Sequence, residues 1–169
     1  MARDSQRSRM YSAEKEATYK CKIVYLDSIH DIRDWVNKIV DSRWFQFRWP
    51  VECIRVTDGR RRSSACGSAQ PDRIFVRADR SARYFGWKGT IKLPKWARYQ
   101  MVVLHEIAHV VTDQEYKRSD GIAAHGPEFC SNLLQLVRRW MGAEAHATLK
   151  ESFKNGRVKH TKRSRYEKS

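Results

Sequence analysis

The sequence has few cysteines and no long apolar run. Its four cysteines are Cys21, Cys53, Cys66 and Cys130, and no two of them form a CxxC pair. A zinc ribbon needs such pairs, so we do not expect one. No segment approaches the roughly 20 apolar residues of a membrane span, and the polar start MARDSQRSRM has no signal-peptide core. We expect a cytoplasmic protein with free thiols and no membrane contact.

Acidic residues are also scarce. The chain carries 34 Lys and Arg against 19 Asp and Glu, which gives a formal net charge of +15. Such an excess is most often matched by nucleic acid, and next by an acidic membrane surface or an acidic protein. A basic surface that serves only solubility is the alternative. The charge therefore favours contact with DNA or RNA.

The length of 169 residues and the hydrophobic fraction of 41% fit one domain with flexible ends. We divide the chain into an N-terminal polar segment (1–20), a domain (21–149) and a basic tail (150–169). The tail has eight Lys or Arg against two Glu. We expect this tail to be loosely held or disordered.

Hydrophobic periodicity indicates an α+β chain. Helical spacing predicts helices at 10–20, 27–42, about 97–113 and from Pro127 onward, with Gly142 as an interruption. Alternation and turn signals predict short strands at 22–26, 44–49, 51–58, 63–69, 72–78 and 89–94. The strand at 44–49 would place Phe45, Phe47 and Trp49 on one side, in the core. Together these strands predict a small antiparallel sheet.

The stretch LHEIAH (104–109) lies in the most apolar of these helices. His105 and His109 are four residues apart, so they lie about 40° apart on one helical face and can bind one ion. Glu106 is rotated by about 100°, where it can reach a water on that ion rather than the ion itself. This is the HExxH arrangement of zinc hydrolases. A chance match in a buried helix is the alternative, but buried imidazoles and a carboxylate need partners, and a metal supplies one.

A catalytic zinc ion usually has three protein ligands. His125, in AHGPEF (124–129), stands just before the helix that begins at Pro127, and the polar link 113–123 can turn it toward His105 and His109. Glu128 could orient a histidine, although a charge at the helix N-terminus is the simpler account. We expect Cys130 to be a core thiol. The ligand types favour Zn²⁺, and manganese or cobalt could occupy the site in vitro.

HEIAH followed by HGPEFC resembles the SprT-like, or Spartan-like, zinc metalloproteases over about residues 100–141. The resemblance implies that His105, His109 and His125 bind zinc and that Glu106 is catalytic. It implies a compact zincin-like domain, with a small sheet packed on the buried HExxH helix and the third ligand at the start of the next helix. It also suggests DNA-dependent cleavage of proteins crosslinked to DNA, although this chain lacks the cysteine zinc ribbon of many members.

The start RDSQRSRMYSAE, together with the same motif, also resembles small HExxH-motif metallohydrolases of actinobacteria and their phages. This second resemblance covers more of the chain. It implies little about function, because those proteins are named for the motif rather than for a substrate.

A basic region between residues 43 and 98 holds fourteen Lys or Arg and four Asp or Glu. Its candidates for contact with nucleic acid are Arg60, Arg61, Arg62, Arg80, Arg83 and Lys88. Tyr84, Phe85 and Trp87 are interleaved with them, and they could equally stack on bases or belong to the core.

Three functions fit these features. The first is a zinc metallopeptidase that cleaves proteins on or near nucleic acid and binds an extended substrate along the strand before the metal helix. The second is a nucleic-acid-binding protein with a structural or vestigial zinc site. The third is a metal-dependent hydrolase of a non-peptide amide.

Overall fold

The computed structural model describes residues 4–22, 24–60, 64–73, 85–116 and 122–160. These residues form an α+β fold with six α-helices and one three-stranded sheet. The elements are α1 (Arg7–Lys20), α2 (Ile29–Val40), α3 (Arg43–Arg48), β1 (Val51–Gly59), β2 (Cys66–Arg73), β3 (Phe85–Pro94), the 3-10 turn η1 (Lys95–Ala97), α4 (Gln100–Glu115), α5 (Pro127–Trp140) and α6 (Ala143–Asn155). No helix in the described ranges is long and apolar enough to cross a membrane.

The sheet is mixed, so the prediction of an antiparallel sheet is wrong. Its strand order is β1-β3-β2, with β3 parallel to β1 and antiparallel to β2. Strand β3 lies between β1 and β2, which both precede it in the sequence. Its alternate residues Gly89, Ile91 and Leu93 are buried. As the central strand, β3 is hydrogen-bonded to a neighbouring strand along both edges. This position suits a strand whose alternate residues are buried.

The second strand continues through the expected turn at Gln70-Pro71, so the strands predicted at 63–69 and 72–78 are partly one element, β2. Pro71 pairs with Trp87 in the ladder. An edge strand tolerates proline because its missing N–H can face away from the neighbouring strand. Residues 74–78 of the second predicted strand lie outside the described residues.

The segment predicted as a strand at 44–49 is the short helix α3. The Ser42 side chain accepts a hydrogen bond from the Phe45 amide and caps it. Phe45 and Trp49 are four residues apart and both are buried, whereas Phe47 is 82% exposed. The prediction that Phe47 is a core residue is therefore wrong. Six residues of apolar alternation are too few to distinguish a strand from one and a half helical turns.

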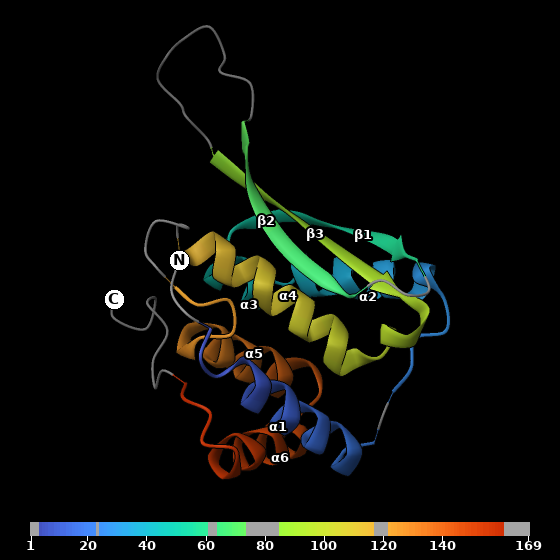
Figure 1. Cartoon of the computed structure of the whole chain (residues 1–169). Coiled ribbons are helices and arrows are strands. Elements are labelled where there is room, and N and C mark those ends of the chain that lie inside the picture. Colours follow the sequence, from blue (N-terminus) through green and yellow to red (C-terminus); the bar gives the residue numbers. More distant parts are fainter. Residues whose placement is uncertain (1–3, 23, 61–63, 74–84, 117–121, 161–169) are drawn as a thin grey trace, which may run out of the picture.

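One face of the sheet is buried under helices and the other faces solvent. On the buried face, a Cβ at Gly89 would contact Val110 of α4 and Ile54 of β1. The helix α4 packs on β2 and β3, and α2 packs on β1. The helices α5, α1 and α6 form a further layer beyond α4 (Figure 1). The helix α4, which carries the HExxH motif, is thus enclosed between the sheet and the other helices.

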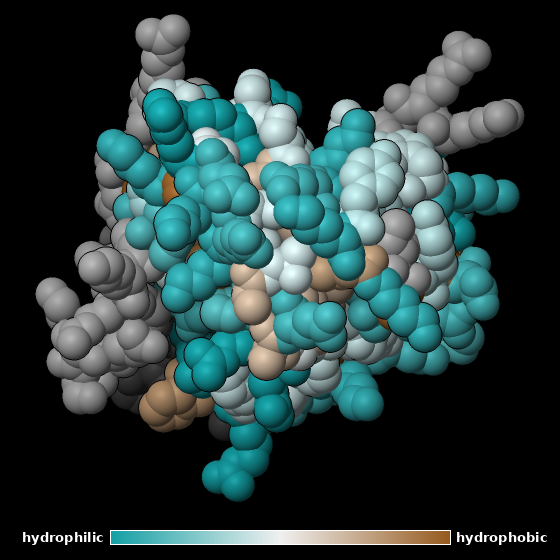
Figure 2. All heavy atoms as spheres, turned by 90° about the horizontal axis from the view of Figure 1, so that it is seen from below, coloured by the Kyte–Doolittle hydropathy of each residue, from teal (hydrophilic) through white to brown (hydrophobic). Residues whose placement is uncertain are grey.

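The four predicted helices are present, and Gly142 separates α5 from α6 with a φ of 96°, a conformation that glycine adopts without strain. The prediction of a strand at 22–26 is wrong for its described residues, 22 and 24–26, which form only an isolated bridge between Tyr25 and Tyr99. The surface over α1 and α6 is mostly hydrophilic (Figure 2).

The basic tail is held in place as far as residue 160, so the prediction of a loose tail from Lys150 is wrong for this part. The helix α6 runs to Asn155 and packs on α1 and α5. Leu149, Phe153 and Val158 are buried. Leu149 and Phe153 are four residues apart, so they lie on one helical face and anchor it in the core.

Candidate metal centre

The helix α4 holds His105, Glu106 and His109 at the centre of the molecule. Most of its side chains are buried, including those of His105 and Glu106. Strand β2 crosses this helix so closely that a Cβ on Gly67 would lie 2.2 Å from the backbone oxygen of Glu106. Only glycine permits this approach. The HExxH turn is therefore fixed directly against the sheet.

His125 comes to the same place from the start of α5. The Gly126 amide donates to the Ala123 carbonyl at 2.9 Å, which turns the chain, and Pro127 begins the helix. One ligand nitrogen from each of His105, His109 and His125 lies within 4.8 Å of the other two. The structure thus brings together the three histidines that the sequence singled out.

Two carboxylates orient two of these histidines, and neither was predicted from the sequence. His105 Nδ1 is 2.8 Å from Glu14 Oε2, and His125 Nδ1 is 2.7 Å from Asp4 Oδ2. A carboxylate on Nδ1 fixes the ring and leaves Nε2 for a metal. Glu14 could have been recognised from its position, because it shares the buried face of α1 with Met10, Ala13 and Ala17. We find no comparable signal for Asp4.

Gln6 ties both ends of the described chain to the third histidine. Its Nε2 donates to the backbone oxygens of His125 and Lys159, each at 2.9 Å, and its Oε1 accepts from the Lys159 amide at 2.9 Å. The side chain is buried. The position of His125 therefore depends on the N-terminal segment and on residues beyond α6.

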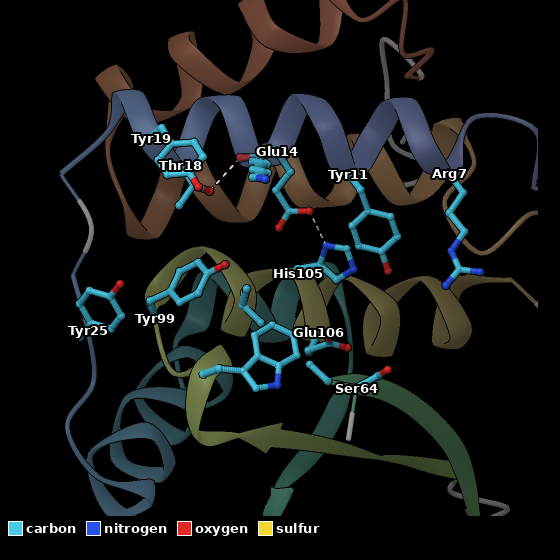
Figure 3. A pocket seen from close by; sticks show the side chains of 14 residues that line it. Arg7, Tyr11, Glu14, Thr18, Tyr19, Tyr25, Ser64, Tyr99, His105 and Glu106 are labelled. Carbon is cyan, nitrogen blue, oxygen red and sulfur yellow. Dashed lines mark hydrogen bonds and ion pairs between the residues drawn. The ribbon is translucent and has the colours of Figure 1, made fainter. Parts of the chain in front are cut away.

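Tyr11 of α1 completes the surroundings of the histidines. Its hydroxyl is 3.1 Å from His125 Nε2, and its ring stacks on His105 at a centroid distance of 5.4 Å. The guanidinium of Arg7 lies 5.7 Å from the centre of the Tyr11 ring. Figure 3 shows Arg7, Tyr11 and Glu14 extending from α1 toward α4. A hydrogen-bond donor and a cation therefore lie on the side of the site that faces α1.

Burial sets the protonation of the ligands. It lowers the pKa of His109 well below the usual value, and neighbouring His105 adds to this effect. It also lowers the pKa of His125, although Asp4 opposes the shift. Burial alone would lower the pKa of His105, but the Glu14 carboxylate outweighs it and the net shift is upward. His109 and His125 are thus neutral near pH 7, the form that binds metal.

Glu106 has the properties expected of a proton acceptor. Burial raises its pKa to about 7, against the opposing effect of His105. Its Oε2 has no hydrogen-bond partner in the described part of the chain. Together with His105, it lines a cavity of about 610 Å³ between α1 and α4 (Figure 3). The Glu106 carboxylate is therefore close to His105 and next to this cavity.

The other residues considered near the site lie outside the group of ligands. Cys130 is buried, with a pKa raised to about 12 by burial, and its thiol contacts the His125 carbonyl at 3.8 Å. It is a core thiol, as expected. Glu128 is in the first turn of α5, where a carboxylate interacts favourably with the helix dipole.

The predicted nucleic-acid contacts are only partly described. Arg61, Arg62, Arg80 and Arg83 lie outside the described residues, as does Tyr84. Arg60 is exposed directly after β1, and Lys88 is exposed on β3. Lys88 alternates with the buried Gly89, so it lies on the outer face of the sheet, away from α4. The structure does not bring it to the metal site.

We predict that Glu14→Gln weakens zinc binding about 10- to 100-fold, because the neutral amide no longer polarises His105. Competition with a chromogenic chelator measures this affinity. Glu16→Gln is the matched control, since Glu16 is on the same helix and pairs with Lys20 at the surface. Equal zinc affinity of the Glu14 variant and the parent would show that this carboxylate does not support a ligand.

The residues fit a metal ion with open coordination positions. They offer three imidazoles, two of them held by carboxylates, and a neighbouring carboxylate with an unpartnered oxygen. Nitrogens on one tetrahedral zinc are about 3.4 Å apart, so small ring rotations would close this triad around the ion. Comparison of the chain with family models, with curated proteins and with solved structures finds no match.

Proposed function

We propose that this protein is a zinc-dependent metallopeptidase of zincin-like arrangement, with His105, His109 and His125 as ligands and Glu106 as general base. One observation carries the proposal: Glu106, whose Oε2 has no partner among the described residues, lines a cavity together with His105, one of three clustered histidines. Zinc held by three imidazoles lowers the pKa of a water molecule to about 7 and polarises a carbonyl group.

Glu106 does the proton chemistry in this proposal. It accepts a proton from the attacking water and delivers it to the leaving amine of the cleaved amide. A carboxylate with a pKa near the working pH suits both transfers. Its position one residue after His105 keeps it beside the ion without making it a ligand.

Tyr11 is placed to stabilise negative charge. Its hydroxyl lies at His125 Nε2, the atom that would bind the metal. If a metal were bound at that nitrogen, the Tyr11 hydroxyl would be free to donate to the carbonyl oxygen of the cleaved peptide bond. Arg7 lies over the Tyr11 ring and adds positive charge on the same side.

A purely structural zinc site is the alternative for this chain. Structural sites are usually closed by four protein ligands. The described residues supply three, and one of them, His105, lines a cavity together with Glu106. These features favour the catalytic assignment over a nucleic-acid-binding protein with a vestigial site.

The strand expected to bind substrate needs correction. The last strand before the metal helix is β3, which is paired on both edges and cannot accept a further strand. The edge strand next to α4 is β2, and Ser64 and Ala65, just before it, line the cavity. An extended peptide would therefore pair with β2.

The net charge of +15 is the reason to place this activity on proteins at or near nucleic acid, in the cytoplasm. The test uses zinc-loaded protein and casein, with and without single-stranded DNA, and mass spectrometry of the fragments. We expect cleavage that a chelator abolishes and added zinc restores. Cleavage that persists in chelator, or an intact substrate in all zinc-loaded samples, would contradict the proposal.

A further inference from the structure

The cavity beside Glu106 has an aromatic wall. It is lined by Tyr11 and Tyr19 of α1, by Tyr25, and by Trp96 and Tyr99 near the start of α4. Figure 3 shows Tyr25 and Tyr99 at one end of the space below α1, with His105 and Glu106 farther along it. An aromatic surface thus leads to the proposed reaction centre.

These aromatic side chains are unusually exposed. Six large hydrophobic side chains are exposed among the described residues, and four of them line this one cavity: Tyr11, Tyr19, Tyr25 and Trp96. Tyr19 is 73% exposed, Tyr25 64% and Trp96 55%. Exposed apolar groups that gather in one place mark a binding surface, whereas scattered ones need no explanation.

The cavity has no large excess of positive charge. Arg7 and Lys15 contribute two cations, and Glu14 and Glu106 contribute two carboxylates. A site for a nucleotide would need an excess of cations for its phosphates. The cavity instead suits an uncharged aromatic group, with polar atoms placed at one end.

We propose that this cavity binds a large aromatic side chain of the substrate polypeptide, next to the peptide bond that is cleaved. The substrate class is thus a protein with an exposed or unfolded Phe, Tyr or Trp. Edge-to-face and stacked contacts with the tyrosines and Trp96 hold the ring. The inference rests on the proposed peptidase function for the cleavage but not for the binding.

Binding is tested first, on Glu106→Gln, so that no substrate is consumed. The probes are acetyl-Ala-Phe-Ala-amide, acetyl-Ala-Ala-Ala-amide and a thymidine dinucleotide, and NMR titration gives each Kd. We expect the Phe peptide to bind at least about tenfold more tightly than the Ala peptide, from burial of the ring. Equal binding of the two peptides, or tighter binding of the dinucleotide, would overturn the proposal.

Cavity variants then locate the site. Tyr25→Ala and Trp96→Ala should each weaken binding of the Phe peptide about three- to tenfold, which is the contribution of one aromatic contact. Phe47→Ala is the matched control, because it removes an exposed aromatic ring from α3, outside the cavity. Both cavity residues are largely exposed, so the fold should persist. Losses of equal size in all three variants would refute the assignment to this cavity.

Mapping of cleavage separates the two proposals. Zinc-loaded parent is given a peptide pool, and the residues beside each cleaved bond are identified by mass spectrometry. Cleavage without a preference for aromatic residues would contradict the proposed aromatic site but not the proposed peptidase function. Tight binding of the Phe peptide without any cleavage would contradict the proposed peptidase function but not the proposed aromatic site.

Discussion

Replacement of Glu106 by glutamine is expected to lower kcat for peptide hydrolysis about 10²- to 10⁴-fold, the usual contribution of a general acid–base group. Glutamine has nearly the same shape but cannot accept the proton. Zinc content should stay at about one ion per chain, because Glu106 is not among the three clustered ligands. Steady-state kinetics on an identified peptide, with elemental mass spectrometry on the same sample, measures both quantities.

The control is Glu128→Gln, which removes a carboxylate from the first turn of α5 without changing the three histidines. It should keep kcat within about twofold, since a helix-terminal charge contributes only modestly to stability. Hydrolysis by the Glu106 variant at the parent rate would show that Glu106 is not the general base. A similar fall in both variants would indicate a general loss of charge near the site.

Replacement of His125 by alanine is expected to reduce bound zinc from about one ion per chain to nearly none. Two ligands on α4 remain, which is fewer than the three of a catalytic site. The free energy of unfolding in the presence of zinc should fall as well, because a ligand at 1,000 times its Kd stabilises the folded state by about 4 kcal/mol. Elemental mass spectrometry and the zinc-dependent shift in Tm measure the two effects.

His30→Ala is the matched control for this substitution. His30 is exposed on α2, and its only ion pair given by the structure is with Asp34, four residues away on the same helix. This variant should bind zinc like the parent and show the same rise in Tm. If the parent itself takes up no zinc after refolding in its presence, the three histidines are not a zinc site.

The cluster of three candidate metal ligands is the part of this protein that the sequence defined most completely. The spacing of His105 and His109 fixes their common face, because helix geometry is local. His125 is predictable from the helix start at Gly126-Pro127. The helices α2 and α5 were also predictable, since apolar periodicity over three turns or more is a strong signal.

The tertiary structure decided what depends on distant partners. It made residues 43–48 a helix, because burying Phe45 and Trp49 together outweighs a six-residue alternation. It placed β3 between β1 and β2, where both edges of β3 are hydrogen-bonded to a neighbouring strand.

The sequence alone thus determined a helix with two histidines, a nearby glutamate and a third histidine at a helix start. Only the fold brought Asp4, Glu14 and Tyr11 to those histidines from more than ninety residues away along the chain. It also gathered the tyrosines of α1 and of residues 25 and 99 around one cavity. Spacing along a helix is set by the backbone, whereas a cavity and its orienting carboxylates depend on how separate elements pack.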